Sequence, residues 1–254
     1  MLYVLDHPVV VFVVTLIILR LAARFGSYLL SRRAPMEDKE HDDLGVILAA
    51  ALTLLGLIIG FTFSMAVTRY DQRKNYEEEE ANAIGTEYLR VNLLPSADTA
   101  RIHQTLREYL DQRIAFYQNR DDAKLPQINA ETSRLQAELW SEVEASGRAN
   151  PTPVVSLAVA GMNDVLNREG YTQAAWWNRI PIAAWCLMFA IAIVCNGLIG
   201  YTSHKLDGKA RRYTVFPLIT AISFFLIADI DSPSRGVIRV HPQNLEALAQ
   251  SLHP

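Results

Sequence analysis

The chain has 254 residues, of which 50% are hydrophobic and 20% are charged, and its formal net charge is −3. This composition excludes a disordered chain and a collagen-like chain, and the slightly acidic balance gives no indication of a nucleic-acid partner. The two cysteines, Cys186 and Cys195, lie in one apolar run and face opposite sides of a helix, which excludes a disulfide scaffold.

Four apolar runs are long enough to be considered as membrane spans. They occupy residues 8–30, 44–68, 181–201 and 213–230. A helix needs about 20 apolar residues to cross a bilayer. The first run contains Arg20 and Arg24, whose long side chains can reach the membrane surface, and the fourth contains Pro217, which we expect to kink its helix. The runs predict an all-α membrane protein with four transmembrane helices and a helical extramembrane domain between the second and third.

The predicted organisation has four parts. They are transmembrane helices 1 and 2 in residues 1–69, a helical soluble domain in 70–175, transmembrane helices 3 and 4 in 176–231, and a C-terminal tail in 232–254. The second span continues past Phe61 without Pro or Gly up to Ile84, so we expect one long helix that ends near Leu94, before Pro95. Apolar side chains at helical spacing predict three further helices, separated by breaks at residues 119–126 and 146–153.

The second span combines small, hydroxylated and large apolar residues. Gly56 and Gly60 are one helical turn apart, a spacing that allows two membrane helices to approach closely. A stripe along the same helix consists of Thr53, Leu57, Phe61, Ser64 and Thr68. Two interpretations remain open for this stripe. It packs within a helix bundle, or it lines a pore in which the large apolar side chains form a constriction.

Acidic residues beside the spans are the candidates for an ion contact. Glu77–Glu80 are four consecutive acids, which surround the helix and cannot all bind one metal. They either face water, or Glu77 and Glu80 contribute to an acidic vestibule formed by several subunits. Asp229 and Asp231 follow the fourth span and either end it in water or provide a weak cation site or a gating contact.

Motifs of enzymes and metal proteins are missing from the sequence. The six histidines do not have the spacing of a helical metal site, and neither a nucleophile motif nor a phosphate-binding loop occurs. An EF-hand loop that began at Asp229 would need an acid where Val240 stands. We therefore predict a protein that is not an enzyme, with no catalytic residue, metal or cofactor.

The basic residues of the two short loops predict an orientation. The loops 31–43 and 202–212 contain Arg32, Arg33, Lys39, Lys205, Lys209, Arg211 and Arg212. Short basic loops usually remain in the cytoplasm, so the soluble domain is predicted to lie on the outer face of the membrane. Arg69, Arg73 and Lys74 flank the second span on the domain side and favour the opposite orientation.

Three segments resemble known families. The segment GFTFSMAVTRYDQRKN, residues 60–75, resembles the second span of bestrophins at Gly60, Phe61, Arg69 and Tyr70. The segments EEANAIGTEYLRVNLLP, residues 79–95, and ADIDSPSRGVIRV, residues 228–240, are similar to the bacterial bestrophin-like domain family of unknown function. The latter likeness covers most of the chain, from the second span onward.

The resemblance implies an oligomeric channel. Bestrophins are pentameric anion channels whose neck is lined by three apolar side chains on the second span, and Phe61, Leu57 and Thr53 have that spacing here. Thr53 replaces an apolar residue of the family pattern, and the acids of DIDSPSRG match the calcium clasp of animal bestrophins only in preceding a proline. The resemblance also implies a cytoplasmic large domain, opposite to the orientation that the loop charges predict.

Together these observations predict a homo-oligomer in the lipid bilayer of a bacterial inner membrane that conducts small inorganic ions, with anions favoured. The pore would run along the second span. The alternative is a membrane-anchored interaction or sensor module, in which the helical domain binds a partner and the spans act only as an anchor.

Overall fold

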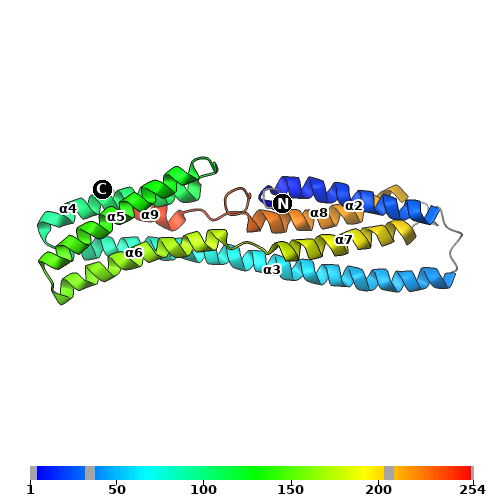
Figure 1. Cartoon of the computed structure of the whole chain (residues 1–254), viewed down its shortest axis with the longest axis horizontal. Coiled ribbons are helices and arrows are strands. Elements are labelled where there is room, and N and C mark those ends of the chain that lie inside the picture. The colour runs from blue at the N-terminus through cyan, green and yellow to red at the C-terminus, as the bar shows by residue number, and fades with distance from the viewer. Residues whose placement is uncertain (1–4, 32–37, 203–208, 253–254) are drawn as a thin grey trace. The chain divides into compact units, whose positions relative to one another are not determined.

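The computed structural model describes residues 5–31, 38–202 and 209–252, and nearly all of them are helical (Figure 1). The helices are α2 (Pro8–Ser31), α3 (Asp38–Arg90), α4 (Ser96–Gln118), α5 (Leu125–Ala149), α6 (Pro153–Trp177), α7 (Ile182–Thr202), α8 (Lys209–Asp231) and α9 (Gln243–Leu252). A 3₁₀ turn at Val91–Leu93 follows α3. No strand occurs among the described residues, which confirms the predicted all-α class.

Within the described residues, four segments are long and apolar enough to cross a membrane. They are Pro8–Leu29, Asp42–Leu93, Pro153–Thr202 (which includes α7) and Thr214–Asp231. The second and third predicted runs lie within these segments, and the first and fourth extend beyond theirs by one residue. Pro217 is inside α8, so it does not end that helix. The basic residues predicted to set the orientation fall partly at 32–37 and 203–208, outside the described residues.

The chain forms two compact units. One unit, which we call the membrane unit, contains residues 1–68 and 179–239, and the other, the helical unit, contains residues 69–178 and 240–254. The long helix α3 contributes residues to both, because it continues without interruption from Asp38 to Arg90. The predicted end of this helix before Pro95 agrees with the structure.

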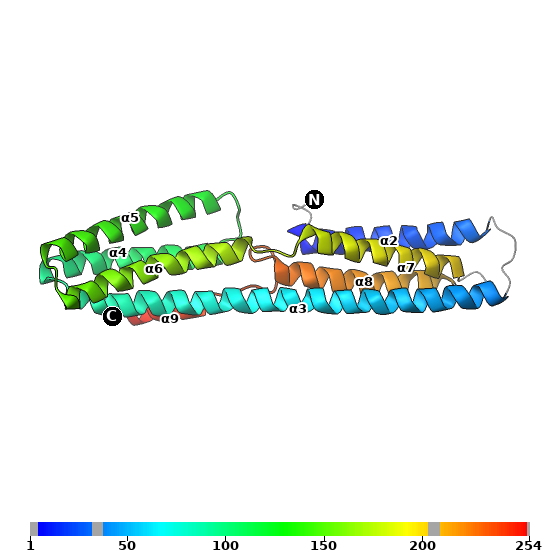
Figure 2. The same ribbon diagram turned by 60° about the horizontal axis from the view of Figure 1, so that its bottom comes forward.

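Within the membrane unit, α2 packs along α7 and α8, and Figures 1 and 2 show these three helices side by side. The contact between α2 and α7 is close because both helices have glycines there. A Cβ atom at Gly26 would collide with the backbone of Gly197, and one at Gly200 would collide with the backbone of Ala23. Such small residues allow membrane helices to maximise van der Waals contact.

The apolar part of α3 is much less covered by its own unit. Of the described side chains between residues 42 and 68, only Leu55, Thr62 and Ala66 are buried. Their positions share one face of the helix, because they are separated by seven and four residues. The described residues on the other faces of this segment are partly or fully exposed in the single chain.

The core of the helical unit lies between the second part of α3 and helices α4, α5, α6 and α9. It is built from fully buried side chains such as Ile84, Leu106, Leu139 and Met162. Helix α9 lies in the segment predicted as a C-terminal tail, and its Leu245 is also fully buried in this core. Helix α6 begins at the predicted break and runs on to Trp177.

Candidate functional site

The candidate pore stripe lies on one side of α3, in its membrane part. Thr53, Leu57, Phe61, Ser64 and Thr68 are all exposed, with 53% of Leu57 and 64% of Phe61 accessible. At 100° per residue, these five positions lie opposite the buried face of the helix. The stripe is therefore directed away from the other helices of the membrane unit.

Two hydroxyls of the stripe already donate hydrogen bonds to the helix backbone. Thr53 Oγ1 donates to the carbonyl of Ala49 at 2.9 Å, and Thr68 Oγ1 donates to the carbonyl of Ser64 at 2.9 Å. In this arrangement each threonine presents its oxygen lone pairs outward, where they can accept but not donate. To solvate an anion, a hydroxyl must rotate and direct its hydrogen away from the helix.

Gly56 and Gly60 lie beside the stripe and have open space around them. A Cβ atom added at either glycine meets no other described atom within 4 Å. The predicted close helix contact is therefore not present within the chain, and it remains a prediction for a contact between copies. The close helix–helix contacts inside the membrane unit involve Gly26 and Gly200 instead, which sequence reasoning missed although both glycines stand in apolar runs.

Glu77 is a buried carboxylate that holds α9. Only 1% of the residue is exposed, and its Oε1 accepts hydrogen bonds from the backbone N–H groups of Asn244 at 2.9 Å and Leu245 at 3.0 Å. Its Oε2 accepts from Asn244 Nδ2 at 2.6 Å. Glu77 thus accepts hydrogen bonds from N–H groups at the start of α9 that have no partner within that helix. Its negative charge also interacts favourably with the positive end of the helix dipole.

Glu80 is buried in a network of polar side chains. It forms an ion pair with Arg113, and both side chains are fully buried. Tyr117 and Thr172 each donate a hydroxyl hydrogen bond to Glu80 Oε2 at 3.2 Å. Burial and the adjacent Glu80 carboxylate raise the pKa of Tyr117 above its ordinary value, so this hydroxyl stays protonated. The carboxylate of Glu80 therefore points into the helical unit, where these protein donors surround it.

These placements give no support to an acidic vestibule at Glu77 and Glu80, which stays a prediction for an assembly of several subunits. A buried and paired side chain cannot contact ions in a water-filled vestibule, so neither Glu77 nor Glu80 provides such a contact in this conformation. The run divides by helical period, because Glu78 and Glu79 lie on the exposed side. Glu79 is held there by an ion pair with Arg168.

Asp229 and Asp231 stabilise the end of α8 in the membrane unit. The two carboxylate oxygens of Asp229 accept the backbone N–H groups of Val237 and Ile238, each at 2.8 Å. Asp231 accepts from Arg179 Nε at 3.0 Å and from the backbone N–H of Ile180 at 3.3 Å. Both aspartates are buried. The arrangement fits the end of a helix, where the carboxylates bind the chain that folds back after α8 and not water. Protein donors therefore occupy both carboxylates.

A metal centre is not formed by the part of the chain that the structure describes. Its His, Cys, Asp and Glu side chains do not come together in any group of three that could hold an ion. The predicted cation site at Asp229 and Asp231 therefore lacks the ligand cluster it would need.

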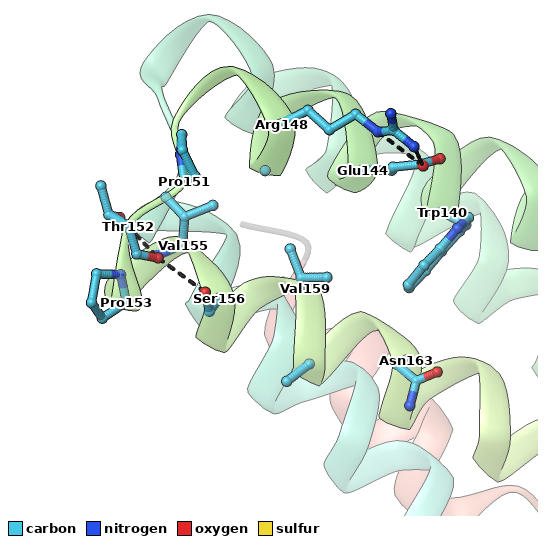
Figure 3. Close-up of a pocket in the computed structure, with 12 residues that line it drawn as sticks. Trp140, Glu144, Arg148, Pro151, Thr152, Pro153, Val155, Ser156, Val159 and Asn163 are labelled. Atoms are coloured by element: carbon cyan, nitrogen blue, oxygen red, sulfur yellow. Dashed lines mark hydrogen bonds and ion pairs between the residues drawn. The ribbon is translucent and has the colours of Figure 1, made fainter.

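A groove lies between the end of α5 and the start of α6 in the helical unit (Figure 3). It has a volume of about 890 Å³ and an apolar lining that includes Trp140, Val155 and Val159. The ion pair between Arg148 and Glu144, at 2.6 Å, stands beside it. A single solvent-exposed ion pair beside apolar walls does not form a catalytic arrangement.

Comparison with protein families and solved structures gives the class of this protein. A family model, the Bestrophin-like domain, matches residues 16–245, so the chain belongs to the bestrophin-like family. A mutant bestrophin homologue from Klebsiella pneumoniae has a TM-score of 0.66 at 15% identity, over 95% of this chain and 97% of that one. Another structure of a Klebsiella pneumoniae homologue has a TM-score of 0.62 at 16% identity, over 94% of this chain and 95% of that one. No curated protein matches.

At these low identities, the two solved structures show a similarity of fold alone. Together with the four apolar helices, they establish a multi-pass membrane protein with the fold of the bacterial bestrophin homologues. The family predicted from the segments around Phe61, Glu79 and Asp229 is confirmed.

Proposed function

We propose that this protein is an oligomeric ion channel in which copies of α3 surround a path across the bilayer. The observation that supports this most directly is the exposure of the stripe at Thr53, Leu57, Phe61, Ser64 and Thr68, opposite the packed face of α3. A membrane helix with an uncovered face of hydroxyls and large apolar groups can line a pore when copies assemble around an axis. Membership of the bestrophin-like family favours five subunits.

Small inorganic anions are the proposed ions. Acidic vestibules favour cations, but Glu77 and Glu80 are buried and paired within the chain, so this argument for cations is removed. Leu57 and Phe61 form the narrowest level of the proposed path, where an apolar constriction gates by dewetting. The proposed location is the inner membrane of a bacterium.

The channel is tested by recording from the purified full-length chain in planar bilayers. Truncating both Leu57→Ala and Phe61→Ala should raise the conductance, because it widens the apolar level and eases its hydration. Reversal potentials under a KCl gradient should indicate anions and change little in the variant. The matched control is Ile17→Ala with Leu21→Ala, two exposed apolar residues of α2, which should leave the conductance unchanged.

Absence of conduction, in wild type and in the Leu57→Ala/Phe61→Ala variant alike, would favour the alternative function. In that case the chain is a membrane-anchored interaction or sensor module. An increase in conductance in the α2 control as large as in the α3 variant would contradict the assignment of the path to α3.

We propose that the helical unit lies on the outer face of the membrane, as the basic short loops predict. A cysteine at Ala123, an exposed residue between α4 and α5, tests this orientation in a background where Cys186 and Cys195 are replaced by serine. An impermeant maleimide should label it on intact cells. Labelling only after lysis would place the unit in the cytoplasm, as in the bestrophin resemblance.

A further inference from the structure

Two arginines stand in the apolar surface of the first span. Arg20 and Arg24 belong to α2 and lie inside the candidate span Pro8–Leu29. Charged residues within membrane spans are rare and mark functional positions. No Lys or Arg occurs in the other three apolar runs, at 44–68, 181–201 and 213–230. The proposed ion path along α3 assigns no role to this pair.

The two arginines share one exposed face of α2. They are one helical turn apart, and both are exposed in the single chain. On the same face, one and two turns before Arg20, stand Ile17 and Val13, which are exposed large apolar side chains. The face therefore presents two positive charges and, towards the start of the helix, an apolar surface beside them.

Neither guanidinium has an acid as a partner in the described part of the chain. Arg20 Nη2 donates a hydrogen bond to Thr214 Oγ1 at 3.2 Å, and Arg24 makes no hydrogen bond or ion pair with a described residue. A guanidinium carries five N–H donors. Most donors of the two arginines are therefore directed at something other than the described residues of this chain.

Thr214 indicates the level of the Arg20 guanidinium in the membrane. It is the first residue of the fourth candidate span, Thr214–Asp231, so its hydroxyl lies at one end of that span. Figures 1 and 2 show α2 and α8 packed side by side, and Arg24 lies one turn closer to the end of α2 than Arg20. Long arginine side chains place their charge at the membrane boundary. Both charges are therefore at the depth of lipid headgroups.

We propose that Arg20 and Arg24 bind the phosphate group of an anionic phospholipid, whose acyl chains lie along Ile17 and Val13. A planar guanidinium matches a phosphate with two parallel N–H donors, and two guanidiniums one turn apart can contact the same headgroup. Basic residues at the ends of membrane helices attract anionic lipids. A zwitterionic lipid fits less well, because the pair of guanidiniums repels its ammonium group.

The experiment is native mass spectrometry of the purified full-length chain in detergent, with equal amounts of phosphatidylglycerol and phosphatidylcholine that have the same acyl chains. We expect wild type to bind phosphatidylglycerol about twentyfold more tightly than phosphatidylcholine, because each arginine near a lipid surface contributes about fivefold. The variant Arg20→Gln/Arg24→Gln should bind the two lipids about equally.

Arg24→Gln alone is the sharpest variant, because it removes no hydrogen bond or ion pair within the described chain. It should lower the preference for phosphatidylglycerol about fivefold and leave thermal unfolding in phosphatidylcholine unchanged. The matched control is Arg120→Gln/Lys124→Gln. It removes two exposed positive charges before α5 in the helical unit and should keep the preference of wild type.

Four results would overturn the proposal. Three are equal binding of the two lipids by wild type, a preference in Arg24→Gln equal to that of wild type, and a loss in the control as large as in Arg20→Gln/Arg24→Gln. The fourth is smaller oligomers of Arg20→Gln/Arg24→Gln in phosphatidylcholine alone, which would mean that the arginines contact another copy and not a lipid. None of these results depends on conduction, so the lipid site and the proposed channel succeed or fail separately.

Discussion

The two parts of α3 use the same secondary structure in opposite ways. In the membrane unit, up to Thr68, the helix exposes large apolar residues such as Leu57 and Phe61 and buries few side chains. In the helical unit, from Arg69 onward, it buries charged residues such as Glu77 and Glu80 and covers them with other helices of the chain. The first part leaves its apolar side chains open to contact with lipid or other copies, whereas other helices of the same chain cover the second part.

The difference agrees with the surroundings predicted for each part, lipid for the first and water for the second. Lipid is as apolar as leucine, so a membrane helix gains little by burying apolar side chains and is held by close packing instead. In water the apolar face of α3 must be buried, and the acids buried with it require partners. The first part of α3 is therefore expected to depend on assembly, and the second on its internal polar network.

The largest effect is expected from breaking that network. Glu80→Ala removes the closer ion-pair partner of the fully buried Arg113, which keeps only Glu169 at 3.8 Å, and it removes the acceptor of Tyr117 and Thr172. Loss of one partner of a buried pair typically costs about 3–5 kcal/mol. We expect the free energy of unfolding of the full-length chain in detergent to fall by that amount, as measured by circular dichroism during denaturant titration.

Arg134→Gln is the matched control for this measurement. Arg134 pairs with Glu131 and Glu138 on the exposed side of α5, where solvent screens the charges, so little change in stability is expected. If Arg134→Gln lowered the free energy of unfolding as much as Glu80→Ala, burial would not explain the stability of the ion pair between Glu80 and Arg113.

The sequence was sufficient for features that depend on local chemistry. The length of α3 follows from the lack of Pro and Gly between Phe61 and Ile84, and its end follows from Pro95. The partners of Glu77 could not be inferred, because Asn244 is 167 residues away and lies in a segment without a strong pattern. At Asn244 the chain comes back to α3, and only the tertiary structure shows that the start of α9 lies beside the carboxylate of Glu77.

The stripe on α3 is an intermediate case. Helical spacing placed Thr53, Leu57 and Phe61 on one face, and the structure adds that this face is uncovered in the single chain. What covers the face in the membrane depends on other copies or lipid, which a pattern in one sequence does not specify.

Smaller effects on stability are expected from substituting two glycines of the membrane unit. Gly200→Leu introduces a side chain against the backbone of Ala23, so it should destabilise the chain itself by about 1–3 kcal/mol, the usual cost of overpacking. Gly60→Leu meets nothing within the chain, so the melting temperature of the subunit should be unchanged while oligomers dissociate more readily. Thermal unfolding and size-exclusion chromatography with light scattering measure the two effects.

The contrast between Gly200 and Gly60 is the result to be checked. Unchanged oligomer size and detergent stability in Gly60→Leu would show that no close contact between copies involves this glycine. The same substitution at Gly56 serves as an independent test of the same face, because it too has open space within the chain.

The smallest effect concerns the buried acid Glu87 in the second part of α3. Its pKa is raised from 4.5 to about 8 by burial, so between these pH values the folded chain keeps a proton that the unfolded chain has lost. The free energy of unfolding must then fall as the pH rises through this range and level off above it. Glu87→Gln should remove this slope and stabilise the chain at pH 8 by at least about 1 kcal/mol, whereas exposed Glu78→Gln should leave the slope in place. Parallel pH profiles for wild type and Glu87→Gln, from denaturant titrations between pH 5 and pH 9, would mean that Glu87 is ionised in the folded chain, and the helical unit would then have to provide it with a charged partner.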